Sequence, residues 1–358
     1  MKIKYLIIFS ITLLNIAGLS AETRGNLERP LLIGPQYPLV YMSTTFEPDT
    51  AFLLKEGEIF FQTSYTLLNT WGYSANAVKT STGVSFNPTG SNGYSVYFDC
   101  ELDRRFLKLQ YGYSDNLELL LVYREIRSIP GSLDATVEDF HNFINIGNMG
   151  RDLTEKNQFE IYIYDNESGR VVLSLNQTSA EFVQESITLG VKFLLKKTAN
   201  EAISLSFSSN FGDNYIERGV NDSTNDSEES DHSNFNDFNT TLRYTSIFTD
   251  WTLHGGFSIS FVNKSLLPKS PEELYYLFLG VNYHVSEYFD LLLQDLEYSS
   301  PFPTDNISSI NADVREISTG ARLYLGKQFS MDLGFVENQS QGPQNIDIAF
   351  FANIMFYF

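Results

Sequence analysis

The chain ends in a segment that alternates apolar and polar residues and closes on an aromatic residue, Phe358. Because successive side chains of a β-strand point to opposite faces, one face of this segment would be apolar: Ile346, Ile348, Phe350, Ala352, Ile354, Phe356 and Phe358. The opposite face would be wetter, with two apolar exceptions, Phe351 and Met355, among Asn345, Asp347, Ala349, Asn353 and Tyr357. A last strand of this kind is typical of a bacterial outer-membrane β-barrel, which alternates lipid-facing and lumen-facing residues.

The same period of two recurs along the second half of the sequence. It is clearest in residues 187–195, 203–211, 251–261, 275–283, 317–325 and 329–335. The polar positions between the apolar ones are mostly Ser, Thr, Asn and Gly. Small polar side chains suit the crowded, wet interior of a narrow barrel.

The connections between these strands fall into two length classes. Short turns are expected at 114–116, 198–201, 249–250, 286–287 and 326–327, and long loops at 68–93, 128–183, 211–236, 263–273, 298–312 and 338–344. A barrel with both termini in the periplasm has one more outer loop than inner turn. The sequence therefore predicts an all-β fold, a transmembrane up-and-down antiparallel barrel of about 12 strands, within a range of 10–14.

Two segments leave the strand pattern open. Residues 157–176 contain two short strands around an Asn-Glu-Ser-Gly turn, Asn166–Gly169, and read either as a hairpin projecting from the long loop, which we prefer, or as two further wall strands. In residues 94–112 the apolar positions change from even at Val96 and Phe98 to odd at Leu107 and Leu109. That change predicts a β-bulge near residues 103–106.

Composition favours a barrel over its main rival, a soluble periplasmic β-sandwich. The chain holds 29 Phe and 21 Tyr, many of them where strands would meet the membrane interface. No run of about 18 apolar residues follows the N-terminal region, which argues against a helical membrane protein. The formal net charge of −20 argues against nucleic-acid binding. Cys100 is the single cysteine, so neither an internal disulfide nor a cysteine-based metal site is expected.

The first residues have the layout of a secretory signal peptide. Lys2 and Lys4 precede an apolar stretch, and small residues follow at Ser20 and Ala21. We expect a cleaved leader over residues 1–21, an extended segment over 22–56 and the barrel over 57–358, located in the outer membrane. The segment 22–56 is rich in proline and is expected either in the periplasm or in the barrel lumen.

Several motifs resemble an uncharacterised bacterial family, domain of unknown function 3187. They are residues 29–39 (RPLLIGPQYPL), Phe46–Asp49, Gly57, Leu109–Leu119, Asp139–Phe143 and Gly150–Asp152. The resemblance is densest over residues 29–160. It implies an outer-membrane β-barrel, and the family supplies no activity or catalytic residues.

The long loop 128–183 carries the candidate loop residues His141, Arg151 and Asp152. Apolar residues at helical spacing after a Thr136 N-cap predict a short helix, which would act either as a lid in the barrel mouth or only as packing. The acidic stretch 221–237, without Lys or Arg, reads as a solvated outer loop; calcium binding is the alternative, although the spacing fits no calcium loop.

Charged residues at expected inward positions are the lumen-lining candidates. They are Asp99, Glu101, Lys192, Arg243, His254, Arg322, Asp332 and Asp347, with Lys108, Glu118 and Arg124 alongside them. They would either line a path for solutes and set its selectivity, or form salt bridges that fill a narrow barrel.

We find no catalytic, metal or cofactor signature. The four histidines, His141, His232, His254 and His284, lack a nearby nucleophile motif. The leading hypothesis is therefore a channel or porin-like conduit for small solutes. The alternatives are a non-conducting structural or adhesive barrel that binds a partner through its outer loops and, less favoured, a rim enzyme using His141 or His254. Expected partners are outer-membrane lipid, small solutes and the barrel-assembly machinery, which would engage the Phe358 strand.

Overall fold

The computed structural model describes residues 28–37, 46–80, 83–87, 93–129, 131, 133–143, 156, 158–176, 180–218, 231–263, 271–300, 313–338 and 346–358. The expected leader, residues 1–21, lies outside them. None of the helices in these ranges has the length and apolar character needed to cross a membrane.

Twelve antiparallel strands form a closed wall. They are β1 (Ile59–Tyr73), β4 (Tyr94–Ser114), β5 (Leu117–Ile129), β8 (Ala180–Lys197), β9 (Glu201–Arg218), β10 (Asp231–Ile247), β11 (Trp251–Val262), β12 (Glu273–Ser286), β13 (Phe289–Tyr298), β14 (Val314–Tyr324), β15 (Phe329–Asn338) and β16 (Ile346–Tyr357). Each pairs with the next, and β1 pairs with both β4 and β16, which closes the ring. The predicted count of twelve is confirmed.

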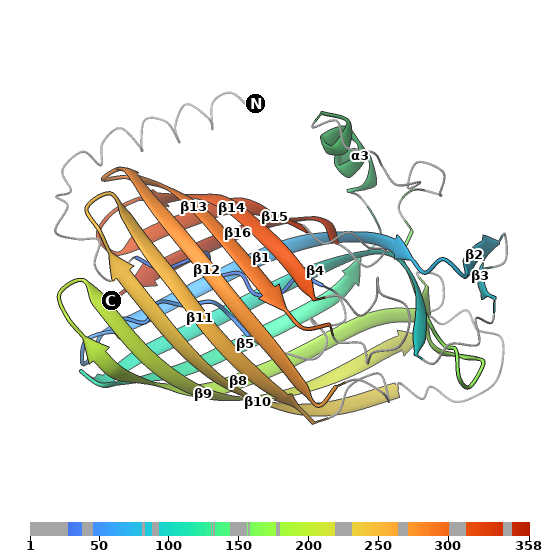
Figure 1. Ribbon diagram of the computed structural model, residues 1–358, viewed down its shortest axis with the longest axis horizontal. Helices are drawn as coiled ribbons and strands as arrows, with labels where there is room; N and C mark the ends of the chain where they lie inside the picture. The colour runs from blue at the N-terminus through green and yellow to red at the C-terminus, as the bar shows by residue number, and fades with distance from the viewer. Residues whose placement is uncertain are drawn as a thin grey trace.

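The five predicted short turns lie together at one end of the barrel, here called the short-turn end (Figure 1). The first and last strands also meet there, since the backbone N–H groups of Ile59 and Phe358 each donate to the other's carbonyl at 2.9 Å. The long connections lie at the opposite, long-loop end. The acidic connection is shorter than predicted, because β9 continues to Arg218 and β10 begins at Asp231.

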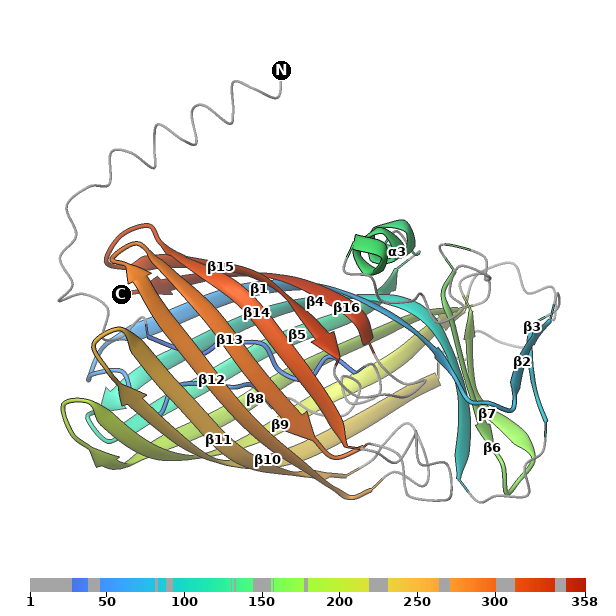
Figure 2. The same cartoon turned by 45° about the horizontal axis from the view of Figure 1, so that its top comes forward.

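The strands outside the wall belong to the long-loop end. A two-stranded sheet of β2 (Ala77–Thr80) and β3 (Gly83–Phe86) follows β1. The hairpin of β6 (Glu160–Asp165) and β7 (Arg170–Asn176) continues the edge of β4 beyond the end of β5: Asp99 pairs with Glu160, whereas Glu101 still pairs with Ile129. The hairpin therefore projects from the barrel (Figure 2), and the fourteen-strand alternative is wrong.

Helix α3 (Asp134–Phe143) is the predicted short helix, but it begins two residues before the expected N-cap Thr136. Asp134 accepts a hydrogen bond from the Asn69 side chain at 3.1 Å, and the Leu133 N–H donates to Glu101. Asn69 and Glu101 face outward, so α3 is held at the outer side of the rim (Figure 1). Of the two readings left open for this helix, the lid inside the barrel mouth is therefore wrong.

Strand β12 shows how the two faces of the wall differ. Its outward residues Leu277 and Leu279 are more than half exposed, with Tyr275 and Tyr283 at the two ends of this apolar stretch. Its inward residues, such as Phe278, are buried. An apolar band flanked by aromatic residues is the surface that a bilayer requires.

The predicted β-bulge at residues 103–106 is wrong. Strand β4 pairs with β1 without a break from Tyr97 to Tyr111, and the irregularity in its pairing with β5 lies at Gly112–Ser114. Even positions of β4 point inward along its whole length. The apolar residues change parity because Phe98 packs against the interior near the long-loop end, while Leu107 and Leu109 face outward nearer the other end.

Candidate functional site

A segment of the chain that precedes β1 lies inside the barrel. We call residues 28–37 the ascending leg and residues 46–54 the descending leg, and the two together the plug. Figure 2 shows their blue trace between the front and back walls. Leu31, Tyr37, Phe46 and Leu54 are each at most 3% exposed. Of the two positions expected for segment 22–56, the described part of it occupies the lumen.

The ascending leg runs from the short-turn end toward the long-loop end. The Arg29 carbonyl accepts hydrogen bonds from Asn282 and Arg322, each at 2.8 Å. Farther along, the Ile33 carbonyl accepts from Gln294 at 3.0 Å, and the Gln36 N–H donates to the Glu316 carboxylate at 2.9 Å. Extended backbone inside a protein must find partners, and here the wall supplies them.

The descending leg returns to the short-turn end. The Ala51 N–H donates to the Thr245 hydroxyl at 2.8 Å, and the Leu54 N–H donates to Glu118 at 3.0 Å. The chain then crosses the end of β4 so closely that a Cβ atom on Gly112 would lie 2.0 Å from the Lys55 carbonyl oxygen. Only glycine allows this crossing, which leads directly into β1.

A buried carboxylate in the descending leg, Asp49, binds cations from the wall and from the other leg. Its Oδ2 lies 3.0 Å from Lys108 Nζ and 3.7 Å from Lys192 Nζ, and it accepts from Gln110 Nε2 at 2.7 Å. Its Oδ1 lies 2.6 Å from Arg29 of the ascending leg. Burial opposes the charge of Asp49, but Arg29 and Lys108 outweigh burial and hold its pKa well below the usual range.

Charge is unevenly distributed around the inner wall. The strands β4, β5, β8 and β10 carry inward cations, which we call the basic arc: Arg104, Lys108, Arg124, Lys192 and Arg243, with Glu118 and Asp237 as the described acids. The strands β13, β14 and β15 carry the acidic arc, Asp290, Glu316 and Asp332, with Arg322 among them. The acids of the descending leg face the basic arc, and the backbone N–H of Gln36 faces Glu316. The plug therefore matches the wall electrostatically.

Near the long-loop end the plug also makes apolar contacts with the wall. Phe46 stacks on Tyr276 with ring centroids 4.9 Å apart, and Tyr37 meets Phe98 edge-on at 6.2 Å. Leu31 belongs to the same buried cluster. Buried apolar area stabilises the docked plug by about 25 cal/mol per Å², so both legs are held by packing as well as by polar contacts.

The structure divides the predicted lumen residues into three groups. Lys192, Arg243, His254, Arg322 and Asp332 lie on the inner face, each at most 8% exposed. Lys192 and Arg322 donate to carbonyls of the plug and Arg322 pairs with Asp332, whereas Arg243 and His254 bond to wall hydroxyls. Asp99 and Glu101 were predicted to face the lumen because a bulge was expected in β4. Without that bulge they face outward, like Leu107, and they are buried beneath other parts of the long-loop end. The side chain of Asp347 lies outside the described structure.

Two histidines lie at the plug. His254 bonds to Thr245 and Asn282, at 3.1 and 3.3 Å. His284 lies 3.0 Å from Asp290 and 3.2 Å from the Thr252 hydroxyl, an Asp–His–hydroxyl set. The Thr252 hydroxyl donates to Glu28 at 2.7 Å, so this set holds the start of the ascending leg.

The loop candidates remain predictions. The side chain of His141 and residues Arg151 and Asp152 lie outside the described structure, as do the side chain of His232 and most of the acidic stretch 221–237. Among the residues that are described, no group of three or more His, Cys, Asp or Glu side chains is placed to hold a metal ion.

Sequence reasoning missed the apolar residues that bind the plug, although a signal for them exists. The apolar exceptions on the inner face of β16 are plug contacts: Met355 clusters with Leu32 and Leu54. Phe351 reaches over glycines, and its Cζ lies 2.5 Å from where a Gly334 Cβ would be. Apolar residues on the lumen-facing side of a barrel strand therefore indicate that the lumen is occupied by another part of the chain.

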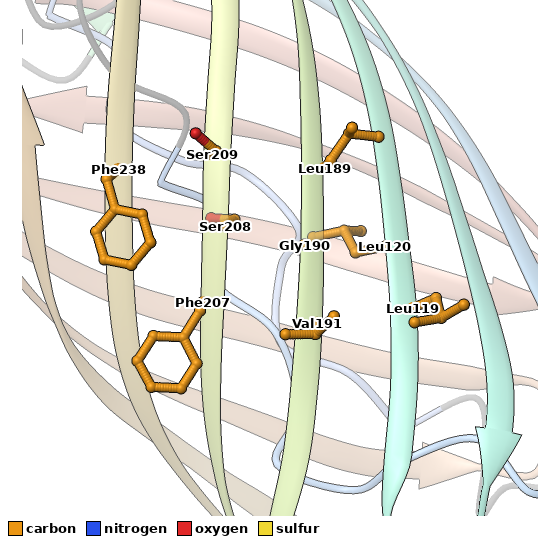
Figure 3. A pocket seen from close by; sticks show the side chains of 9 residues that line it. All are labelled: Leu119, Leu120, Leu189, Gly190, Val191, Phe207, Ser208, Ser209 and Phe238. Carbon is orange, nitrogen blue, oxygen red and sulfur yellow. The ribbon is translucent and has the colours of Figure 1, made fainter.

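One shallow groove lies on the outer wall (Figure 3). It runs over β5, β8, β9 and β10 and is lined by Leu119, Leu120, Leu189, Gly190, Val191, Phe207, Ser208, Ser209 and Phe238. Strand pairing beneath it is continuous, with Gly190 opposite Ser208 and Ser208 opposite Asn239. The groove is therefore part of the lipid-facing surface and does not open into the lumen.

Comparison with known proteins places the chain in a family and a fold. A family model described as "Protein of unknown function (DUF3187)" matches residues 8–358. No curated protein matches the sequence. Among solved structures, the COG4313 outer membrane channel from Pseudomonas putida F1 has a TM-score of 0.50 and 10% identity, covering 88% of this chain and 100% of that one.

Two further structures are less similar. The translocator domain of the autotransporter NalP from Neisseria meningitidis has a TM-score of 0.43 and 12% identity, over 85% of this chain and 90% of that one. A FadL homologue from Pseudomonas aeruginosa has a TM-score of 0.40 and 10% identity, over 84% and 90%. At 10% identity, the likeness to the COG4313 channel concerns the fold alone: a closed barrel of the outer-membrane type.

Proposed function

This chain belongs to the DUF3187 family of proteins of unknown function, and from that premise and the geometry above we propose that it is a gated outer-membrane channel for small solutes. The gate is the plug. The observation that carries the proposal is that both legs lie inside a closed wall and bind it mainly through side chains. Displacing the plug would leave the hydrogen-bonded ring of the wall intact.

The nature of the plug contacts supports a gate more than a permanent filling. The wall meets the plug through charged and hydroxyl groups, such as Lys108 and Thr245, that water could solvate if the plug left. A lumen evolved only for stability would gain more from apolar packing, since buried ion pairs stabilise little in net terms. These charged and hydroxyl groups of the wall therefore suit a path that water and solutes also use.

Conductance tests the proposal. In planar bilayers we expect the wild-type protein to be closed most of the time, and a variant with residues 28–54 replaced by a Gly/Ser linker to show steady, discrete conductance. Folding of each protein is checked by heat-modifiable gel mobility. A folded plug-replaced barrel that stays electrically silent would remove the channel proposal.

The single cysteine gives a second measurement. Cys100 is 1% exposed and belongs to the same buried cluster as Tyr37. We expect a water-soluble maleimide to label Cys100 slowly in the wild type and many times faster in the plug-replaced variant. This reports plug displacement whether or not current flows.

A second candidate function rests on the projecting hairpin. β7 is the edge strand of its sheet, and Val171 and Val172 are 46% and 39% exposed. An exposed edge can add a strand from a partner. We therefore keep an adhesive role as the alternative: cells displaying the barrel without residues 158–176 would then lose adhesion to one another that wild-type cells show.

The expected assembly partner stays a prediction. Phe358 is 66% exposed at the seam between β16 and β1, where the barrel-assembly machinery would engage it.

A further inference from the structure

The contacts of Asp49 define a binding site for an anion. Lys108 and Gln110 from β4 and Lys192 from β8 converge on one carboxylate oxygen, Oδ2. All three side chains belong to the wall, and each is at most 3% exposed. The opposite oxygen, Oδ1, is bound by Arg29, which belongs to the plug and would leave with it.

The wall around this site carries more positive charge than the carboxylate of Asp49 neutralises. Lys192 is already paired with Glu118 at 2.9 Å, and Arg243 stands on β10 two residues from Thr245, which binds the neighbouring Ala51. Removing the plug takes away the two acids that face this arc, Asp49 and Glu47, while every cation of the basic arc stays on the wall. Because isolated buried charges are costly, the emptied arc would recruit other anions.

We propose that Asp49 is an internal stand-in for the solute and that the channel passes small oxyanions, carboxylates first, which displace it from Lys108, Gln110 and Lys192. This rests on the proposed channel function and adds its substrate class. Lysines suit a transit site, because a flexible ammonium group binds as a point charge, whereas arginine forks clamp carboxylates bidentately. Passage requires binding that is strong enough to admit a solute and weak enough to release it.

Ion selectivity tests the proposal in the full-length chain. We expect Asp49→Asn to open at least about tenfold more often than wild type, since it leaves the buried Lys108 without its carboxylate partner. In a KCl gradient its reversal potential should have the sign of an anion-selective pore. Replacing Lys108 and Lys192 by Gln in the same variant should reduce or abolish that preference. A cation-selective pore, or a preference that survives both lysine replacements, would overturn the proposal.

Competition for the site gives a readout that does not depend on current. At matched ionic strength, citrate or acetate should speed maleimide labelling of Cys100 in the wild type several-fold relative to chloride, and inorganic phosphate serves as the second oxyanion. Equal rates in all four salts would overturn the proposal. An effect of phosphate alone would reassign the solute class to phosphates and reject carboxylates.

Matched variants separate the possible failures. Asp295→Asn makes the same chemical change on the outer face, where Asp295 pairs with Arg315 at 2.6 Å, and should leave labelling and conductance unchanged. If opened variants conduct without anion preference, the anion site is wrong and the channel stands. If Cys100 becomes labelled but neither Asp49→Asn nor the plug-replaced barrel conducts, the channel itself is wrong.

Discussion

At the scale of single residues, the plug depends on a close contact between its two legs. A Cβ atom on Gly34 of the ascending leg would lie 2.2 Å from the carbonyl oxygen of Phe46 in the descending leg. That oxygen belongs to the backbone, so it can move away only if a whole leg shifts. Gly34 therefore fixes how closely the legs pack, and its backbone also hydrogen-bonds the Glu47 carboxylate.

Gly34→Ala should weaken plug docking by about 1–3 kcal/mol, the usual cost of overpacking a buried site. We expect Cys100 to react with maleimide about tenfold faster or more, with heat-modifiable mobility unchanged. The control is Gly255→Ala on the outer face, where an added Cβ would meet only ordinary contacts at 3.7 Å or more. Equal labelling of Gly34→Ala and wild type would show that the legs do not pack in this way.

Acid should not release the descending leg between pH 7 and pH 5. Docking lowers the pKa of Asp49, so its contribution is present above the unfolded value and is lost only as pH falls well below the usual range. Burial raises the pKa of Glu47, an effect that Arg104 only partly offsets, so docking takes up a proton there and is favoured as pH falls. Amide-exchange protection factors of residues 46–54 should therefore be no lower at pH 5 than at pH 7. A clear loss of protection at pH 5 would contradict this assignment.

At the scale of elements, the wall strands were predictable and the plug was not. Alternation is a local property, so Ile187 and Leu189 on β8 or Leu277 and Leu279 on β12 reveal their strands without knowledge of the rest. The plug has no periodicity, and its partners lie up to 328 residues away, as Arg29 and Tyr357 do. The error in the long-loop region, the predicted bulge in β4, arose where the strand extends beyond the bilayer and burial no longer follows the lipid-and-lumen rule.

The β6–β7 hairpin should be dispensable for the wall. Replacing residues 158–176 by a short linker removes strands that pair with β4 only over Tyr94–Asp99, so we expect folded, heat-modifiable protein. As the contrasting deletion of similar scale, removing β14 and β15 (Val314–Asn338) should abolish the folded band, because it takes two paired strands out of the ring. Loss of folding in the hairpin deletion would mean that the extension is part of the barrel core.

At the scale of the whole molecule, the outer surface is a membrane-matched belt, and the interior combines charged side chains with an apolar cluster near the long-loop end. The amino-acid sequence predicts the belt, because Tyr275 and Tyr283 stand on either side of the apolar stretch of β12. It predicts which residues of β8 to β15 point inward, Lys192 and Arg322 among them. It does not tell whether water, salt bridges or another part of the chain fills the space, since that depends on contacts between residues distant in sequence.

Charge in the belt should cost most at its centre. Leu279→Arg lies near the middle of β12 and should destabilise the barrel by about 2–4 kcal/mol, whereas Tyr283→Arg, nearer the short-turn end, should cost about 0–1 kcal/mol for the charge itself. Guanidinium unfolding in lipid vesicles measures the difference. Similar costs at both positions would mean that the bilayer is not centred on this stretch.

After the crossing at Gly112, a single turn over residues 55–58 joins the plug to β1. In the proposed gate, so short a covalent connection keeps a displaced plug close to the lumen, so the local concentration of the plug stays high after every release. In the proposed channel, resealing is a first-order event that does not depend on the number of copies in the membrane, and each solute has to compete with the carboxylate of Asp49.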